Sequence, residues 1–335
     1  MFEETEKRKV EHIKICLNED VQFRKSNGFE RFEFIHNALP DINFDEIDMR
    51  IKFLGKEFEY PVFIEAMVGG TEMAKDINRN LALAAQKLGI GMGVGSQRAM
   101  LENDKLLSTY YVRDIAPDIF LVGNIGAIQL LNYDIERIID MVKEIEADAL
   151  AIHLNAAQEI VQPEGDRNWK GVYERIKELC KRANFPIIAK EVGNGINGEI
   201  AKKLVNAGVK AIDIAGAGGT SWVKVEYYRK GVNAEPFFEW GIPTADALRS
   251  CTASVKIPII ASGGIYNGLD AAKAIAMGAT LVGIARPLLN PAIKGWEEVV
   301  AFLKNYINEM KIAMFLVNAK NLNELKKRKI KAKNQ

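Results

Sequence analysis

The stretch IPIIASGGIYNGLDAAKAIAMGA (257–279) decides the fold of this chain, because it joins a short apolar run, a small-residue turn and a segment with helical spacing. The same unit occurs eight times between residues 61 and 286. Its apolar runs are PVFIEAM (61–67), IGMGVG (90–95), IFLVGNI (119–125), ALAIHLN (149–155), PIIAKEV (186–192), KAIDIAG (210–216), IPIIASGG (257–264) and TLVGIAR (280–286). The runs are too short for helices and too uniformly apolar for half-exposed strands, which predicts strands buried on both faces. Eight such strands, each followed by an amphipathic segment, predict an α/β fold, the closed parallel (β/α)8 or TIM barrel.

Two regions flank this predicted barrel. We expect an N-terminal arm over residues 1–45, the barrel over 46–290 and a C-terminal extension over 291–335. The arm begins with a segment that looks helical and continues as an irregular run. The extension has a helix over 295–319, packed across the bottom or side of the barrel, and a basic tail that we expect to be solvated and frayed.

Composition excludes several classes of protein. The formal net charge of +1 gives no electrostatic case for binding nucleic acid or a membrane surface. Three widely spaced cysteines form neither a metal motif nor a disulfide framework, so a reducing cytosol is the expected compartment. The charged N-terminus has no apolar core of a signal peptide, and no run approaches the ~18 apolar residues of a membrane span. We therefore expect a soluble protein of the cytoplasm.

The predicted active site lies at the carboxyl ends of the strands, where enzymes of this fold place it. Strand seven ends in ASGGI (261–265) and strand eight in VGIARPLL (282–289). Glycines let the backbone approach a ligand, a following helix N-terminus favours an anion, and Arg286 can add a charge-assisted contact. The two loops together predict a phosphate site, whereas a single glycine pair would be explained by a tight turn. The long segment 218–248 after strand six is typical of a lid or substrate wall.

Lys190 is an isolated charge at the end of an apolar strand. Because burying it is costly, we expect it to point to the barrel mouth and meet an anion. Asn124, Ser96 and Thr220 also follow strands. A lysine opposite a phosphate site is typical of barrels that bind FMN, although these residues alone leave a phosphosugar barrel open.

Three further segments gather charge that a flavin does not require. They are RKVEH (8–12), GVGSQRAM (93–100) and AIHLNAAQEIVQPEGDR (151–167). Basic and amide groups with one carboxylate suit a polyanion and a divalent cation, because Mg²⁺ is commonly held by one carboxylate and substrate phosphates. Two simpler interpretations stay open, a structural histidine at His153 and a solvated helix face for residues 8–12.

These segments, with INRNLALAAQKLGIGMGVGSQRA (77–99), AKEVGNGI (189–196) and GAGGTSW (216–222), resemble the type II isopentenyl-diphosphate delta-isomerases. The resemblance runs from about residue 7 to about residue 290. It implies interconversion of isopentenyl and dimethylallyl diphosphate in isoprenoid biosynthesis, with FMN, NADPH as flavin reductant, and Mg²⁺. It also implies a homo-oligomer, a tetramer or octamer, whose arm caps the substrate.

The resemblance assigns roles residue by residue. Gln158 would be catalytic beside the reacting carbons, and Glu159 would bind the metal. The predicted substrate contacts are Arg8, Lys9, His12, Ser96, Gln97, Arg98, His153, Asn155 and Gln158. The predicted FMN contacts are Met67, Val68, Gly69, Ser96, Asn124, Lys190, Thr220, Gly263, Gly264, Ala285 and Arg286. Val68 and Ala215 depart from the family pattern, which has a threonine and a serine at these positions.

The chemistry of the implied reaction constrains the site. The substrate alkene has no adjacent carbonyl, so moving its double bond passes through a carbocation and needs an acid and a base. An amide such as Gln158 is a poor acid and a poor base, whereas reduced FMN offers both a proton and an electron-rich face. Two alternatives are an FMN-dependent barrel oxidoreductase acting on a small anionic substrate, and a flavin-binding barrel without catalysis.

Overall fold

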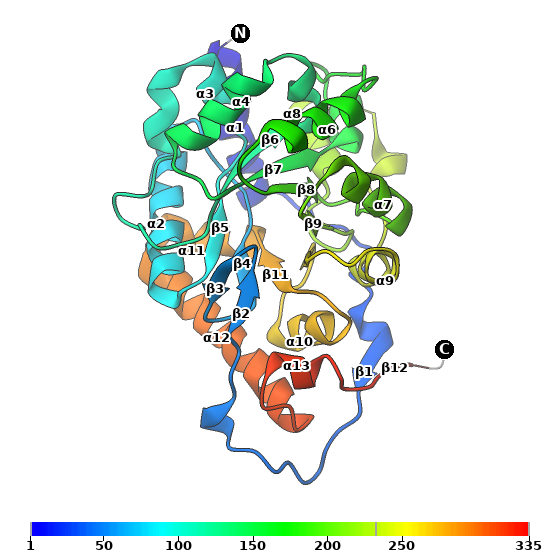
Figure 1. The fold of residues 1–335 in the computed structure, drawn as a ribbon. Helices are drawn as coiled ribbons and strands as arrows, with labels where there is room; N and C mark the ends of the chain where they lie inside the picture. Colours follow the sequence, from blue (N-terminus) through cyan, green and yellow to red (C-terminus); the bar gives the residue numbers. More distant parts are fainter. Residues whose placement is uncertain (1, 232, 334–335) are drawn as a thin grey trace.

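The structure is a computed structural model that describes residues 2–231 and 233–333. Eight parallel strands close a barrel in chain order, with the last strand paired to the first (Figure 1). The strands are β4 (Val62–Ile64), β5 (Gly91–Gly93), β6 (Leu121–Gly126), β7 (Ala149–Leu154), β8 (Ile187–Glu191), β9 (Ala211–Asp213), β10 (Ile259–Ser262) and β11 (Leu281–Ile284). Seven of them lie within the apolar runs and β6 extends one residue beyond its run, to Gly126, so the predicted (β/α)8 barrel is confirmed.

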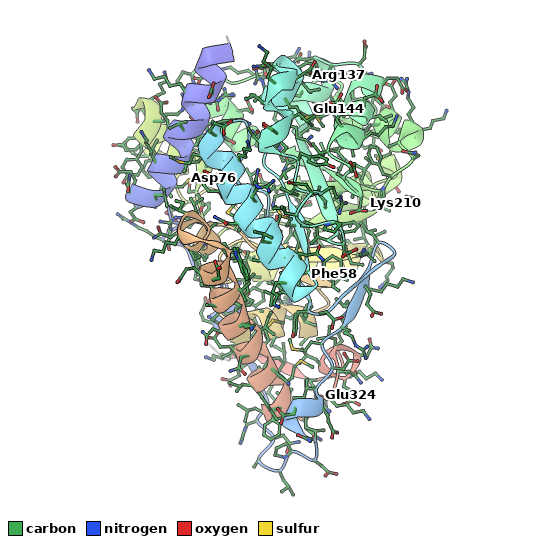
Figure 2. All side chains as sticks on the ribbon, turned by 90° about the vertical axis from the view of Figure 1, so that its left-hand side faces the viewer. Phe58, Asp76, Arg137, Glu144, Lys210 and Glu324 are labelled. Carbon is green, nitrogen blue, oxygen red and sulfur yellow. The ribbon has the colours of Figure 1, made fainter. Side chains whose placement is uncertain are left out.

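Helices surround the barrel and connect its strands. The outer layer contains α2 (Glu72–Leu88), α4 (Ile135–Glu144), α6 (Val172–Arg182), α7 (Gly198–Ala207), α9 (Thr244–Ser254), α10 (Gly268–Ala276) and α12 (Trp296–Leu316). Helix α12 packs against α2 and α10, on the side of the barrel. Figure 2 shows charged side chains on this layer, among them Arg137 and Glu144 of α4, which form an ion pair at 2.7 Å. No helix within the described residues is long and apolar enough to cross a membrane.

Shorter elements lie in the loops after the strand ends. They are α3 (Arg98–Glu102), η3 (Asp104–Thr109), η4 (Ala127–Leu131), α5 (Ala156–Val161), α8 (Trp222–Lys230), η5 (Glu235–Phe237), η6 (Arg286–Leu288) and α11 (Leu289–Lys294). Helix α8 belongs to the long segment after strand six and contacts both α5 and the N-terminal helix. This arrangement makes the segment a wall of the barrel mouth, as predicted.

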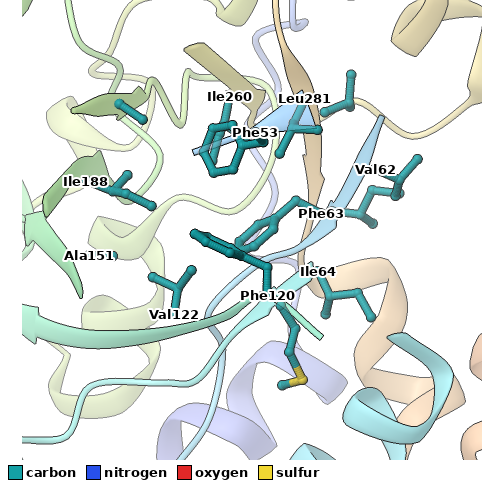
Figure 3. Close-up of a cluster of buried hydrophobic side chains, with 14 of the residues drawn as sticks. Phe53, Val62, Phe63, Ile64, Phe120, Val122, Ala151, Ile188, Ile260 and Leu281 are labelled. Atoms are coloured by element: carbon teal, nitrogen blue, oxygen red, sulfur yellow. The ribbon is translucent and has the colours of Figure 1, made fainter. Parts of the chain in front are cut away.

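Side chains alternate along each strand between the barrel interior and the helical layer. Phe63 and Ile188 belong to the buried apolar cluster within the barrel, shown in Figure 3 with Val122, Ala151 and Ile260. Two positions further along the same strands, polar side chains take the inward positions: Glu65 follows Phe63, and Lys190 follows Ile188. The barrel interior is therefore apolar in its core and polar at the mouth, where the carboxyl ends of the strands lie.

A β-hairpin closes the opposite end of the barrel. Strands β2 (Ile51–Phe53) and β3 (Lys56–Phe58) pair antiparallel just before β4. Phe53 is fully buried, and its ring meets the rings of Phe58 and Phe120 edge to face, at centroid distances of 5.9 and 5.6 Å. The three rings form an aromatic floor between the hairpin and the start of β6.

The arm and the tail are more ordered than predicted. The arm contains α1 (Phe2–Asn18), η1 (Phe29–Arg31), β1 (Phe32–Phe34) and η2 (Phe44–Glu46). The basic tail contains α13 (Leu322–Leu325) and β12 (Ile330–Ala332), and β12 pairs antiparallel with β1 at the end of the molecule away from α1 (Figure 1). The expectation of a frayed tail is therefore wrong up to Lys333, because backbone hydrogen bonds to the arm order it.

Replacing Phe53 with alanine tests the aromatic floor. We expect Phe53→Ala to lower the free energy of unfolding by about 3–5 kcal/mol, the usual cost of removing a buried phenyl ring. Chemical denaturation measures this loss. Leu39→Ala is the control: Leu39 is 85% exposed, so its truncation should change stability by less than about 0.5 kcal/mol. Equal stability of the two variants would contradict the role of the floor.

Candidate functional site

One large cavity opens at the carboxyl ends of the barrel strands and is covered by α1. It contains almost every residue predicted for the site. The lining residues that were predicted are Arg8, Lys9, His12, Met67, Val68, Gly69, Ser96, Arg98, Asn124, His153, Asn155, Gln158, Glu159, Lys190, Thr220, Gly263, Gly264, Ala285 and Arg286. The fold therefore brings segments from both halves of the chain into one site.

Gln97 is the exception. Its side chain is fully buried away from the cavity, where Nε2 donates to the carbonyl of Met141 and Oε1 accepts from the backbone N–H of Asn124. Its neighbours Ser96 and Arg98 line the cavity, because successive residues of this turn point in different directions. The structure thus does not place Gln97 where it can contact a substrate, and its amide supports strand β6 instead.

The glycine pair after β10 forms a close backbone junction. Gly263 and Gly264 have φ of 102° and 70°, and a Cβ on either would lie 2.1–2.3 Å from backbone atoms of Gly216 or Gly218. Among the described residues, the N–H groups of Gly263 and Gly264 donate to no protein acceptor. They are free to bind an anion, with Arg286 across the same part of the cavity.

The helix that follows this pair is arranged differently from the prediction. The N-terminus of α10 does not offer its first N–H to a ligand, because the N–H of Gly268 donates to Glu309 Oε2 at 2.7 Å. The helical element next to Arg286 is instead the short η6–α11 segment after β11. The predicted phosphate site therefore rests on the two loops and this short segment.

Two residues that sequence reasoning missed support the glycine loop. Asn27, in the arm, donates from Nδ2 to the carbonyl of Gly264 at 2.6 Å, and Thr244 donates from Oγ1 to the carbonyl of Gly263 at 2.5 Å. Both bonds engage the carbonyl oxygens of the loop and leave its N–H groups free. No local motif marks either residue, since each acts through chain segments far away in the sequence.

Lys190 meets its anions inside the protein. Its Nζ lies 2.8 Å from Glu65 Oε2 and 2.5 Å from Asp213 Oδ2, and all three side chains are buried. Lys190 lines the cavity and meets an anion, as expected, but two carboxylates of the protein supply the charge: Glu65, directly after β4, and Asp213, at the end of β9. Glu65 and Asp213 were not predicted as site residues, although both stand in the quoted runs.

Helix α1 brings to the mouth a cation, Lys9, that forms no ion pair with an acid among the described side chains. Lys9 Nζ donates to the carbonyl of Ser96 at 2.8 Å and to Tyr110 Oη at 2.7 Å, and both acceptors are uncharged. Burial lowers the pKa of Lys9 to about 7, with the nearby charges of Arg8 and Arg98 acting in the same direction. A cation held in this way lacks a counter-anion, which a ligand can supply. The arm that brings it belongs to the same chain.

A second contact of α1 reaches Glu226 on α8, another residue that was not predicted. Glu226 Oε1 lies 3.0 Å from His12 Nε2 and accepts from Gln158 Nε2 at 3.0 Å, while Oε2 accepts from Arg229. Burial alone would raise the pKa of Glu226, but these three partners lower it to about 2. An ionised carboxylate therefore lies directly behind Gln158.

Polar groups from β7 complete the floor of the mouth. His153 Nδ1 donates to Asn124 Oδ1 at 2.7 Å. Burial, followed by the charges of Lys190 and Lys9, lowers the pKa of His153 to about 3, so the ring is neutral. Glu159 accepts from Asn155 Nδ2 and from the N–H of Asp166, whereas Asn155 Oδ1 is buried without a partner.

Comparisons with known proteins agree with this geometry. The chain matches the FMN-dependent dehydrogenase family over residues 3–104 and 134–332. It is 50% identical to an isopentenyl-diphosphate delta-isomerase of Pyrococcus furiosus over 334 residues, covering 96% of this chain and 85% of that protein. It is 46% identical to the enzyme of that name from a Nostoc species over 332 residues, covering 96% and 95% of the two chains.

Solved structures share the fold at lower identity. A structure described as a lactate oxidase of Pediococcus acidilactici superposes with a TM-score of 0.72 at 19% identity, covering 100% of this chain and 95% of that chain. A mandelate oxidase structure with bound (S)-mandelic acid gives a TM-score of 0.68 at 14% identity, covering 100% and 99%. These likenesses establish the barrel. The matched family and the close relatives together show that this chain belongs to the FMN-dependent dehydrogenase family and, within it, to the isopentenyl-diphosphate delta-isomerases.

Proposed function

We propose that this protein interconverts isopentenyl diphosphate and dimethylallyl diphosphate, using FMN kept reduced by NADPH and a substrate-bound Mg²⁺. The observation that carries the proposal is that two features lie together at the mouth. The first is Lys9, a cation that pairs with no acid among the described side chains, and the second is the amide of Gln158, which donates to the carboxylate of Glu226. An FMN-dependent oxidoreductase on the same barrel needs a flavin site but has no use for this pair.

FMN fits the lower part of the cavity. The free N–H groups of Gly263 and Gly264, in a junction too close for any side chain, suit the phosphate together with Arg286. Lys190 suits the polar edge of the ring system, and Met67, Val68, Gly69, Ser96, Asn124, Thr220 and Ala285 line the space between. When bound and reduced, FMN supplies a proton and an electron-rich face that stabilises positive charge, with no net oxidation of the substrate.

The diphosphate fits the cationic part of the mouth. Arg8, Lys9 and Arg98 lie there, and among the described side chains two carboxylates form ion pairs with them: Glu102 lies 2.9 Å from Arg98, and Glu164 lies 3.9 Å from Arg8. A diphosphate would complete the charge balance and raise the pKa of Lys9. Holding this end of the substrate places its alkene in a fixed position, which converts binding energy into orientation.

Gln158 and Glu226 act at the reacting end. Gln158 is held from both sides, because Nε2 donates to Glu226 and Oε1 accepts from Asn155 Nδ2 at 3.1 Å. This fixes the direction of the amide beside the substrate. Since Glu226 is ionised, its negative charge stabilises positive charge that develops on the substrate carbons, and α1 excludes water from them.

Mg²⁺ fits beside Glu159. No cluster of three or more histidine, cysteine or acidic side chains suited to a metal exists within residues 2–231 and 233–333. Asn155 Oδ1 has no partner among the described residues, and the carboxylate of Glu159 lies beside this side chain. Each of the two groups can offer an oxygen ligand, which suits an ion that takes its other ligands from substrate phosphates and water.

Anaerobic conversion tests the proposed function. With FMN, NADPH and Mg²⁺, the protein should convert isopentenyl diphosphate into dimethylallyl diphosphate, detected by chromatography, without stoichiometric consumption of NADPH. Gln158→Ala should lower turnover by roughly 100-fold, the scale of losing a group placed at the proton transfer, and still bind FMN. An oxidised product, or NADPH used once per substrate molecule, would identify an oxidoreductase instead.

Lys9→Met separates binding from stability. Because the pKa of Lys9 is about 7 in the folded protein and higher in the unfolded chain, the unfolded state binds more protons between pH 7 and 10, and stability rises with pH there. The variant removes this penalty, so its Tm should exceed that of wild type by about 2 °C or more at pH 7, less at pH 10.

The same variant should weaken binding of isopentenyl diphosphate by about tenfold, measured by calorimetry, because the diphosphate loses a charge-assisted contact. The control is Lys75→Met on α2, whose lysine lies at the surface beside Glu72. It should change neither quantity. A Lys9→Met protein that is less stable and binds normally would contradict both parts of the assignment.

Glu159→Gln tests the metal site. Loss of the charged ligand should lower turnover by roughly tenfold or more and abolish its response to Mg²⁺, while FMN affinity stays as in wild type. A titration of activity with Mg²⁺ measures this. Glu174→Gln, on the exposed face of α6, is the matched control. Unchanged dependence on Mg²⁺ in Glu159→Gln would place the metal elsewhere.

A further inference from the structure

The interior layer beneath the cavity contains two carboxylates for one ammonium group. Lys190 Nζ bridges Glu65 Oε2 and Asp213 Oδ2, and Glu65 and Asp213 are only 2% and 1% exposed. If both acids were ionised, the cluster would carry a net charge of −1 inside the barrel. Burying an uncompensated charge is costly, and a group in that situation takes up a proton instead.

The hydrogen bonds indicate which acid remains ionised. Asp213 uses both oxygens, because Oδ2 accepts from Lys190 while Oδ1 accepts from Ser262 Oγ at 2.5 Å and from the N–H of Ala215 at 3.3 Å. Each of these three partners is a donor. Its environment therefore favours the carboxylate form.

Glu65 has the opposite environment at one oxygen. Its Oε2 accepts from Lys190, but its Oε1 is buried and has no hydrogen-bond partner. The same residue lines the large cavity. The neighbouring strand leaves room for Oε1, since a Cβ on Gly283 of β11 would lie 1.9 Å from it. A carboxyl oxygen that is buried without a donor favours the protonated form, because ionisation would leave it neither solvated nor hydrogen-bonded.

The charges around Glu65 support this reading. Burial, followed by the charge of Asp213, raises the pKa of Glu65 to about 8, although Lys190 acts against the shift. Lys190 itself stays protonated, because the two acids outweigh its burial and raise its pKa. The other ionisable side chain at this level is His153 of β7, which is neutral, while β10 and β11 contribute only Ser262 and Gly283.

We propose that Glu65 is a neutral positioning residue of the FMN site: its carboxyl carries a proton and so keeps the Glu65–Lys190–Asp213 cluster in the cavity wall uncharged. The inference rests on the FMN binding proposed above. Loss of the proton leaves an uncompensated negative charge in the wall of the cavity, beside Lys190. FMN binding should therefore weaken as the pH rises through the range in which Glu65 ionises.

The test is the dissociation constant of oxidised FMN for the apoprotein between pH 7 and 9, followed by quenching of flavin fluorescence. Wild type should lose about tenfold in affinity across this range, the effect of one unit of coupled pKa. Glu65→Gln keeps a neutral donor of the same shape, so it should match wild type at pH 7 and show no loss up to pH 9.

Two further variants make the result specific. Asp213→Asn removes the neighbouring negative charge, so Glu65 should ionise below pH 7. The tenfold loss of FMN affinity between pH 7 and 9 (the pH step) should then vanish. Glu191→Gln addresses the other buried acid next to Lys190, whose carboxylate accepts four backbone N–H groups of its own loop and whose pKa burial raises to about 7. This control should retain the step.

Each outcome is decisive. The proposal is overturned if the pH step survives in Glu65→Gln, or if it disappears in Glu191→Gln alone. A tenfold loss of FMN affinity in Glu65→Gln at pH 7 also overturns it. Failure of the wild-type protein to bind FMN at any pH would instead contradict the proposed cofactor. If Glu65→Gln does not fold, the Asp213→Asn titration still distinguishes the two acids.

Discussion

The alternation of side chains along parallel strands is the constraint on which this structure depends. Inward positions recur every second residue, so an apolar residue in the barrel core is followed two positions later by a residue at the mouth. Phe63 on β4 and Glu65 directly after it obey this rule, as do Ile188 and Lys190 on β8. The same backbone regularity thus builds an apolar core and places ionisable groups directly next to it, at the mouth.

Groups placed there must balance their charges with few partners. The protein does so within the barrel by surrounding Lys190 with Glu65 and Asp213. At the mouth a carbonyl and a phenol hold Lys9, and no acid among the described side chains pairs with it. The first arrangement is nearly complete without a ligand, whereas the second is completed by one. This difference separates a region suited to holding a cofactor from a region suited to an anionic substrate.

The arm links the two regions. Helix α1 supplies Lys9 and His12 to the mouth, and the segment after it supplies Asn27 to the glycine loop. The backbone of Phe23 also donates to the carbonyl of Gly219. A chain segment that the barrel does not need for its closure therefore both covers the region suited to an anionic substrate and supports the loop suited to phosphate. Its position explains why the arm and the barrel loops form one site.

The sequence by itself determined the eight-stranded barrel, the cavity at the strand ends and most of the residues that line it, because these follow from local periodicity and from polar residues at the ends of apolar runs. It did not determine partners. His12 and Glu226 are 214 residues apart, and Lys190 and Asp213 lie on neighbouring strands, so only closure of the barrel and docking of α1 decided which groups meet. Local pattern likewise placed Gln97 in the right turn, but the direction of its side chain, away from the cavity, depends on packing against β6. Periodicity sets where a side chain begins, whereas tertiary contacts set what it touches and which charge it carries.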